Sequence, residues 1–291
     1  WRPPMILTLD VGNSQVFGGV FDDGNLTLRF RRTAQPSLSS DELGLFLLGV
    51  LRENKSDPSR IDQIALCSVV PDLIYSLRSC CRKYFGVDPF ILQAGTKTGL
   101  QIRYRHPLEV GPDRIANAIG ATHLYPGRNL IIIDFGTATT FDVIRAPSDY
   151  LGGIIVAGLR IAMEALEKTT ARLPTVEIVP ATTLVGRSTV ESIQSGLYFG
   201  NRAVVKGLTQ EIREQMFQGE PAVVIGTGGL SRLFEHENLF DLILPDLVLI
   251  GLEHALSLNE GASRRWSTQE TGATRPISMD LSSMRSGGDQ E

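Results

Sequence analysis

Two aspartates end apolar runs and are followed by polar, glycine-bearing turns. Asp10 ends MILTLD and precedes VGNSQ, and Asp134 ends NLIIID and precedes FGTATT. Glycine lets a backbone approach a phosphate closely, and Mg²⁺ binds through a few carboxylates plus water and phosphate oxygens. The two turns together predict two phosphate clamps that face each other, although each turn alone is also ordinary hairpin chemistry.

A third aspartate, Asp113, lies beside Arg114 in the segment EVGPDR. Proline suits the first turn of a helix, so Gly111-Pro112 predicts a helix start. The positive field there should favour the carboxylate form of Asp113. This carboxylate could accept a proton from a substrate hydroxyl, and Arg114 could pair with a substrate carboxylate. Simple helix capping with a local ion pair explains the segment as well.

A weaker signal is the turn Gly226–Gly229, which follows the apolar run AVVI. It could pass under an adenine or ribose, and a tight strand-to-helix connection explains it equally well. The turn before the long second-half helix, residues 186–189, needs no ligand because capping accounts for it.

The elements that must position these residues repeat along the chain. Each half opens with a strand, a polar turn and a second strand, at 5–21 and at 129–144. This is a hairpin, unlike the strand–turn–helix of dinucleotide-binding and P-loop units. Strands then alternate with helices, which indicates α/β layers and a ligand cleft between two duplicated halves. We expect domains at 5–126 and 127–260, then a disordered polar tail at 261–291.

Helix signals support this division. Ser39 and Glu42 have capping-box spacing before LGLFLLGVL, and Ser188 and Glu191 have the same spacing before a long helix. Its expected apolar face contains Val190, Ile193, Leu197, Val204, Leu208, Ile212 and Met216. Gly200 could interrupt that helix.

Composition excludes several classes of protein. The net charge of −4 gives no broad basic field, so we expect no nucleic-acid partner. No run approaches the roughly 20 apolar residues of a membrane span, so we expect no membrane association. The cysteines, Cys67, Cys80 and Cys81, are odd in number and are expected to be reduced thiols in a cytoplasmic protein.

Five segments taken together resemble a known family. They are DVGNS, YRHPLEVGPDR, IDFGTATTFD, LGGIIVAGL and GRSTVESIQSG. In this order they resemble the superfamily of acetate and sugar kinases, actin and heat-shock chaperone ATPases, and within it the type III pantothenate kinases, over residues 5–260. The resemblance implies two duplicated ribonuclease-H-like domains with an interdomain cleft, the actin-like ATPase fold. It also implies ATP-dependent phosphorylation of pantothenate, the first step toward coenzyme A.

The resemblance further implies roles for single residues. Asp113 would be the general base, and Asp134 would bind K⁺ or NH₄⁺, which this family requires besides Mg²⁺. Pantothenate would contact Tyr104, Gly111, Pro112, Asp113, Arg114 and Thr189. ATP would contact Asp10, Val11, Gly12, Asn13, Ser14, Gln15, Val16, Phe17 and Thr137. Family members are homodimers, so we expect one here.

Departures from the family pattern are small. Ser14 stands where the family usually has threonine, Pro112 replaces a more usual alanine, and Arg105-His106 replaces a more acidic or neutral pair. Two other functions stay open at this point. One is another small-molecule kinase or a phosphohydrolase of the superfamily, and the other is a nucleotide-binding regulatory protein without catalysis.

Overall fold

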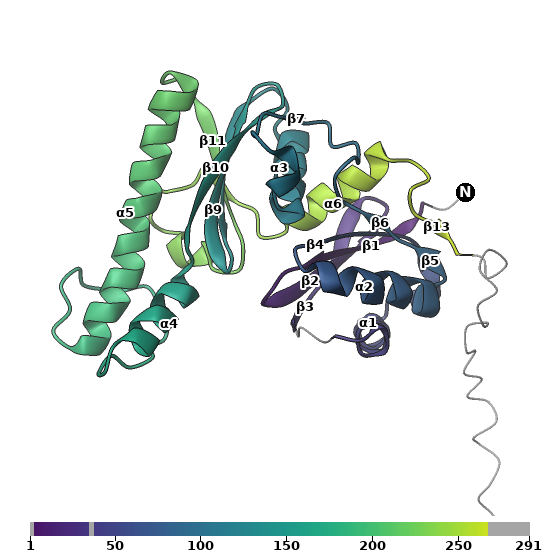
Figure 1. Cartoon of the computed structure of the whole chain (residues 1–291), viewed down its shortest axis with the longest axis horizontal. Coiled ribbons are helices and arrows are strands. Elements are labelled where there is room, and N and C mark those ends of the chain that lie inside the picture. The colour runs from purple at the N-terminus through teal and green to yellow at the C-terminus, as the bar shows by residue number, and fades with distance from the viewer. Residues whose placement is uncertain (1–2, 35–37, 267–291) are drawn as a thin grey trace, which may run out of the picture.

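The computed structural model describes residues 3–34 and 38–266, which form two lobes that each contain a β-sheet (Figure 1). The first sheet contains, in spatial order, β3 (Asn25–Thr33), β2 (Gln15–Asp22), β1 (Met5–Val11), β4 (Ile61–Ser68) and β6 (Phe90–Ile91). The second contains β12 (Leu242–Ile243), β11 (Ala222–Thr227), β8 (Asn129–Phe135), β9 (Ala138–Arg145), β10 (Asp149–Ala157) and β7 (Gln101–Ile102).

The two sheets have the same core arrangement. In the first, β1 pairs antiparallel with β2 and parallel with β4, and β3 continues antiparallel beyond β2. In the second, β8 pairs antiparallel with β9 and parallel with β11, and β10 continues antiparallel beyond β9. This equivalence confirms the predicted duplication, and both predicted strand–turn–strand openings are hairpins.

Helices form the remaining layers. They are α1 (Ser40–Glu53), α2 (Ile74–Cys80), α3 (Pro112–Leu124), α4 (Leu159–Thr169), α5 (Thr189–Phe217) and α6 (Leu247–Leu258). The capping box between Ser39 and Glu42 is present in both directions. At α5, Ser188 accepts from the Glu191 backbone, but the Glu191 carboxylate accepts from the backbone of Arg187. Only half of the second predicted capping box therefore forms.

The prediction for the interior of α5 was partly wrong. The helix runs for 29 residues without a break, so Gly200 does not interrupt it. Ile193, Leu197 and Ile212 are buried as predicted. Three other residues of the expected apolar face are exposed to solvent: Val190, Val204 and Met216. One flank of the helix packs against no other part of the described residues, so periodicity alone overestimated its buried face.

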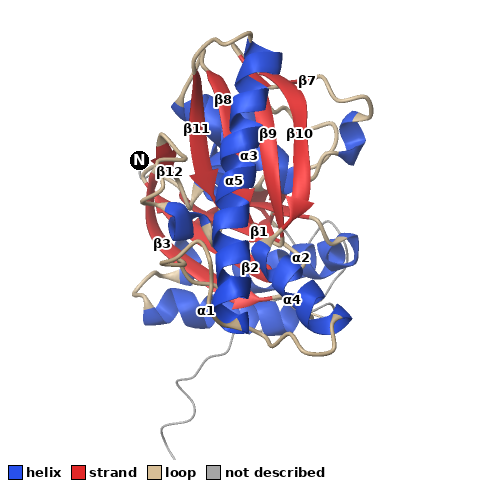
Figure 2. Cartoon of the chain, turned by 90° about the vertical axis from the view of Figure 1, so that its left-hand side faces the viewer, coloured by secondary structure: helices blue, strands red, loops and turns tan. Residues whose placement is uncertain are grey.

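The helices lie between the two sheets and on the outer face of each (Figures 1 and 2). Apolar residues of α1 and α2 pack on one face of the first sheet. The helices α3 and α6 lie between the two sheets, and α5 packs on the opposite face of the second sheet. At the α3–α6 crossing, a Cβ on Gly251 would lie 1.8 Å from the Ala116 carbonyl oxygen, so only glycine permits this close approach. The crossing therefore sets how the lobes meet.

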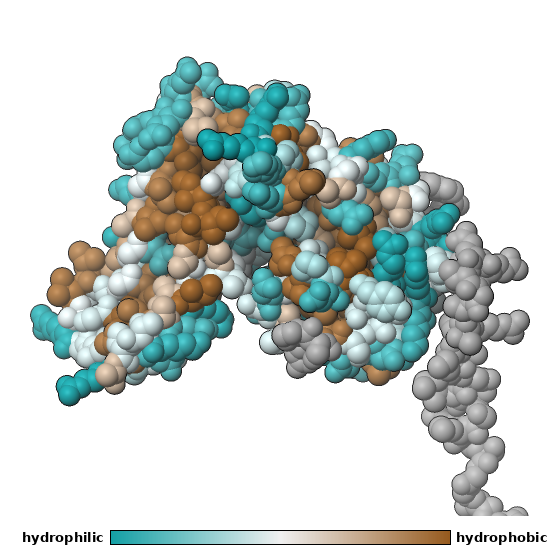
Figure 3. All heavy atoms as spheres, in the orientation of Figure 1, coloured by the Kyte–Doolittle hydropathy of each residue, from teal (hydrophilic) through white to brown (hydrophobic). Residues whose placement is uncertain are grey.

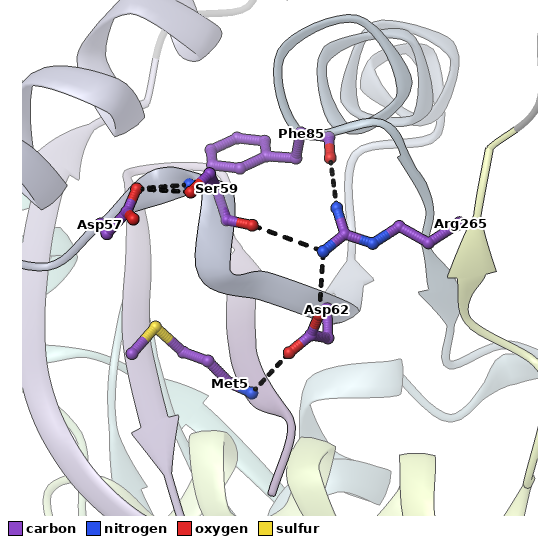
Figure 4. Close-up of polar contacts among 6 residues, drawn as sticks. All are labelled: Met5, Asp57, Ser59, Asp62, Phe85 and Arg265. Carbon is purple, nitrogen blue, oxygen red and sulfur yellow. Dashed lines mark hydrogen bonds and ion pairs between the residues drawn. The ribbon is translucent and has the colours of Figure 1, made fainter. Parts of the chain in front are cut away.

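The last described residues return to the first lobe (Figure 4). The strand β13 (Arg264–Arg265) pairs with β5 (Val87–Asp88), and the Arg265 guanidinium lies 2.8 Å from the Asp62 carboxylate. Ser263 is buried, and its hydroxyl accepts from the Ile64 backbone. Residues 261–266 of the predicted tail therefore have defined contacts, and 267–291 lie outside the described residues.

Two other sequence-based expectations can be compared with the structure. All three cysteines are buried and free, as predicted for reduced thiols. Among the helices that the structure describes, no one combines the length and apolarity needed to cross a bilayer. The division of the chain near residue 126 stays a prediction, and α6, from the second half of the sequence, packs against β1 of the first sheet.

Candidate functional site

A row of four residues crosses the first sheet in register. Cys67, Asp10, Phe17 and Arg31 are direct neighbours on β4, β1, β2 and β3. Residues directly opposite one another on adjacent strands point to the same face of a sheet. The Cys67 thiol donates to Asp10 Oδ1 at 3.3 Å, and the Arg31 guanidinium lies 3.7 Å from the centre of the Phe17 ring. The row thus extends from Asp10 of the predicted phosphate loop to the charged side chain of Arg31 on the edge strand.

The other two aspartates approach from the second lobe and from α3. Asp134 lies at the end of β8, and its Oδ2 accepts from Asn117 Nδ2 at 2.9 Å. Asp113 and Asn117 are four residues apart on α3, so they occupy one face of the helix. Asn117 Oδ1 is buried and has no hydrogen-bond partner among the residues that the structure describes. Helix α3 therefore brings a carboxylate and an unsatisfied amide oxygen to Asp134.

The three carboxylates share one electrostatic environment. Burial, followed by the charge of Asp113, raises the pKa of both Asp10 and Asp134 to about 7. Asp134 also raises the pKa of Asp10, so all three lie close enough for their charges to interact. In the described part of the chain, neither Asp10 nor Asp134 forms a salt bridge.

The expectation for the protonation of Asp113 was wrong in direction. Its Oδ1 accepts from the Arg114 backbone at 2.9 Å, and this bond and the Arg114 charge lower the pKa. Burial outweighs both and raises the pKa of Asp113 above its ordinary value. The helix N-terminus was read correctly, but sequence does not show how deeply the carboxyl is buried. A raised pKa suits a general base, because its conjugate acid is then a weaker acid.

The two predicted clamps meet across the lobes. The hydroxyls of Ser14 and Thr137 are 2.9 Å apart, which places the first turn against the second. A Cβ on Gly228 would lie 2.3 Å from Asp134 Oδ1, and its φ is +84°, so glycine is required where this turn passes Asp134. The turn Gly226–Gly229 thus lies at the site, as its weak signal suggested.

A cavity of about 660 Å³ opens beside these turns. Its walls come from both lobes: Phe17, Arg29, Phe30, Arg31, Gly228, Gly229, Arg232, Pro245 and Asp246. Arg29 pairs with Asp246 at 2.7 Å, whereas Arg31 forms no salt bridge with any residue that the structure describes. A polyanion such as a nucleotide would meet glycine backbone and arginine side chains here.

Arg114 has a different partner from the one that sequence suggested. Its guanidinium lies 2.7 Å from Asp142 Oδ1, with both side chains buried, and the Tyr150 hydroxyl donates to the same oxygen at 2.5 Å. The pKa of Asp142 is raised to about 6 because burial outweighs the opposing effect of Arg114. The network ties the N-terminus of α3 to β9 and β10. Contact between Arg114 and a substrate carboxylate stays a prediction.

The remaining predicted substrate contacts lie either near the N-terminus of α3 or on the other side of the second sheet. Tyr104 lies beside Arg114 and Tyr150, 3.4 Å from the position that a Cβ on Gly152 would take. Gly111 caps α3 and Pro112 begins it, so these two adjoin Asp113. Thr189 is exposed at the start of α5, a helix that packs on the face of the second sheet opposite to α3 (Figure 2).

The first loop contains both buried and exposed side chains. Val11 and Val16 are buried in the first sheet, so only their backbone could face a ligand. Asn13, Ser14 and Gln15 are exposed. The predicted donors therefore point away from the core, and their contact with a phosphate stays a prediction.

The donors at the site suit cations. Among the described residues, no group of three or more His, Cys, Asp or Glu side chains is arranged to hold a metal ion. Mg²⁺ commonly uses one or two carboxylates plus phosphate oxygens, which Asp10 could supply. Asp134 and the unsatisfied Asn117 Oδ1 offer hard oxygen donors for a further cation. Asp10 and Asp134 are partly buried carboxylates without a salt bridge among the described residues, so bound cations would offset their charge and the residues fit.

Sequence reasoning missed several residues of this site. Asn117 could have been found, because it lies one helical turn after Asp113 on a predicted helix. Asp142 carried a signal too, as a charged residue inside an apolar strand. Nothing in the sequence relates Cys67 or Arg31 to Asp10, because strand register decides those contacts.

Comparison with known proteins agrees with this geometry. The family model for type III pantothenate kinase matches residues 6–211. A type III pantothenate kinase of Legionella pneumophila is 56% identical over 255 residues, which are 88% of this chain and 99% of that protein.

Two solved structures are similar in fold. A Campylobacter jejuni protein described as a Baf family transcriptional activator has a TM-score of 0.54 at 20% identity, over 87% of this chain and 98% of that one. A Sinorhizobium meliloti protein described as a 2-dehydro-3-deoxygalactonokinase has a TM-score of 0.54 at 13% identity, over 88% of this chain and 97% of that one. The similarity to the second, a sugar-kinase type of structure, agrees with the predicted fold class.

Proposed function

The chain belongs to the type III pantothenate kinase family, and from this premise we propose that it transfers the γ-phosphoryl group of ATP to the primary hydroxyl of pantothenate. The observation that carries the proposal is the convergence of Asp10, Asp113 and Asp134 beside a cavity whose walls come from both lobes. Phosphoryl transfer mainly requires alignment and neutralisation of charge, and this site offers residues for both.

In the proposed reaction, Asp113 accepts the proton of the attacking hydroxyl. Its carboxylate is partly buried and accepts from the Arg114 backbone, which fixes its position, so it can hold the substrate hydroxyl in line with the phosphate. The bond from the hydroxyl oxygen to γ-phosphorus forms while the bond from γ-phosphorus to the bridging oxygen breaks, and ADP leaves. Tyr104, Gly111 and Pro112 would line the pantothenate pocket.

The nucleotide would lie in the cavity between the lobes. Its phosphates would contact the first loop, Asp10–Phe17, and Thr137 of the second. The Ser14–Thr137 contact supports this arrangement because it already holds the two turns together. The base would extend toward Gly228 and Gly229. Asp10 would hold Mg²⁺, and Asp134 with Asn117 would hold K⁺ or NH₄⁺; bound cations would offset the charge of the triphosphate and of the three acids.

We further propose a homodimer. Thr189, which the family resemblance assigns to pantothenate, starts a helix on the face of the second sheet opposite to α3, so a second copy is needed to bring such a residue to the pocket. Figure 3 shows apolar side chains gathered on the second lobe over β10 and toward α4. Exposed apolar residues include Ile155 of β10, Ile161 and Leu166 of α4, and Leu184 and Val185 between α4 and α5. Such a patch favours a protein partner.

Packing of α5 supports the same proposal. A Cβ added at Gly196, Gly200 or Gly207 would meet nothing within 4 Å, so this flank of the helix is open to another copy. Leu184→Asp should give a monomer by light scattering and weaken pantothenate use. A Leu184→Asp variant that keeps the mass of a dimer and the wild-type KM would contradict the proposed interface. The proposed cellular location is the cytoplasm, where three free thiols stay reduced.

The function is tested by ADP release with and without pantothenate, in potassium and again in sodium. We expect ADP release to require pantothenate and Mg²⁺ and to be faster in potassium. Release that other alcohols support equally well would contradict the proposed substrate. Equal rates in potassium and sodium would contradict the proposed monovalent site but not the kinase reaction.

A further inference from the structure

Arg31 occupies an unusual position for a residue of an edge strand. It lies on β3, in register with Phe17, which in turn is in register with Asp10. Its guanidinium lies over the Phe17 ring at 3.7 Å and forms part of the wall of the 660 Å³ cavity. An aromatic face holds a guanidinium plane in a defined orientation and leaves its edge N–H groups free to donate.

The charges around Arg31 indicate where it acts. The acids whose charges reach it are Asp246, Asp10 and Asp134, in that order. Asp246 already pairs with Arg29, two residues before Arg31 on the same strand. Asp10 and Asp134 are the acids placed above at the reacting end of the nucleotide. Arg31 therefore lies between the cavity and the phosphoryl-transfer centre.

We propose that Arg31 is a further catalytic residue, which donates to the phosphate oxygens of ATP as the γ-phosphoryl group is transferred. Three carboxylates close to a triphosphate leave an excess of negative charge that cations must offset. A guanidinium is always charged and matches phosphate oxygens in geometry, and arginine contacts of this kind accelerate phosphoryl transfer. The inference rests on the proposed function and names one more residue of the same site.

The strand itself offers a matched control. Arg32 is the next residue on β3, and because side chains alternate along a strand it points to the opposite face. It lies over the Phe46 ring at 5.4 Å and donates to the Glu42 carbonyl, away from the cavity. Arg32→Gln thus removes the same charge from the same strand without touching the site.

The experiment measures kcat and KM for ATP in the wild type, Arg31→Gln, Arg31→Lys and Arg32→Gln. We expect Arg31→Gln to lower kcat/KM by roughly 10²-fold, in the range found for removing one preorganised donor. Arg31→Lys should be intermediate, because it keeps the charge but loses the stacked plane. Arg32→Gln should match the wild type. Equal kcat/KM in Arg31→Gln and Arg32→Gln would overturn the proposal.

Binding distinguishes a phosphate contact from a nucleoside contact. ATP should raise the melting temperature of the wild type more than AMP does, and Arg31→Gln should lose this difference while keeping the AMP shift. If Arg31→Gln lost the AMP shift as well, Arg31 would serve the nucleoside and the proposal would be wrong. Arg31 is exposed, so the free variants should melt like the wild type.

A double-mutant cycle tests whether the Phe17 ring positions the Arg31 guanidinium. Phe17→Leu should lower kcat/KM in the wild type and have little further effect in Arg31→Gln, because the ring acts through the guanidinium. Additive losses would show that Phe17 does not position Arg31. If wild-type ADP release does not depend on pantothenate, the proposed function fails; if it does and Arg31→Gln is fully active, only this inference fails.

Discussion

The hairpins β1–β2 and β8–β9 have the same local structure but different neighbours. Each delivers an aspartate at the end of its first strand, and in each the pKa of that aspartate is raised to about 7. Asp10 meets Cys67 and, through Phe17, Arg31. Asp134 meets Asn117, and the same hairpin carries Asp142, which anchors α3 through Arg114. The repeated hairpin places an aspartate at the end of its first strand in both lobes. The residues packed around each hairpin then determine what that aspartate contacts.

The largest expected effect is on stability, through the ion pair between Asp142 of the second hairpin and Arg114. Asp142→Asn should lower the free energy of unfolding by about 3–5 kcal/mol, because it leaves the buried Arg114 charge without its partner. Urea unfolding measures this. Tyr150→Phe removes only one donor and should lower it by about 1 kcal/mol. Equal losses in the two variants would show that the ion pair does not anchor α3.

The next effect is on the residue that neither hairpin supplies. Asp113→Asn should lower kcat by roughly 10²-fold or more, as expected for removing a general base, while ATP still raises the melting temperature. Steady-state ADP release and thermal shift measure the two quantities. An unchanged kcat would exclude Asp113 as the base, and a lost ATP shift would assign it to nucleotide binding instead.

A smaller effect tests whether the two aspartates are equivalent. The pKa of Asp134 rises on folding from an ordinary value of 3.8 to about 7, so between about pH 4 and pH 7 the folded protein binds more protons than the unfolded chain. Stability without ligands should therefore fall as pH rises through this window. Asp134→Asn should remove this part of the slope and stabilise the free protein at pH 8 by about 1 kcal/mol or more.

If the two hairpins are equivalent, Asp10→Asn should change the pH dependence of stability in the same way as Asp134→Asn. Urea unfolding from pH 5 to pH 8 compares the variants. Parallel pH profiles for the wild type and both variants would contradict the raised pKa values. With Mg²⁺ and ATP present, the wild type should lose much of the slope, because cations favour the ionised carboxylates.

The smallest effect concerns the contact between the hairpins. Ser14→Ala removes the hydroxyl that meets Thr137 across the lobes and should raise the KM for ATP a few-fold, with about 0.5–1.5 kcal/mol lost in stability. Ser14→Thr keeps the hydroxyl and should stay near the wild type in both measurements. If Ser14→Ala and Ser14→Thr gave the same KM, the contact would have no part in nucleotide binding.

Much of this molecule follows from local rules. Alternating apolar runs, polar turns and Gly111-Pro112 predicted both hairpins and the start of α3, because turn chemistry and capping depend on residues close in sequence. The same rules were wrong about Gly200, since packing of a long helix against the second sheet can offset the low helix propensity of a glycine. They also misjudged Asp113, whose burial depends on residues far away in the chain.

The sequence by itself determined the repeated hairpins, their aspartates and the family resemblance. Only the tertiary structure decided that Arg31 shares a row with Asp10, that Asp142 holds Arg114, and that Asn117 meets Asp134. Strand register and the glycine-mediated crossing of α3 and α6 set these contacts. Both depend on how distant segments pack, and periodicity within one segment carries no information about that.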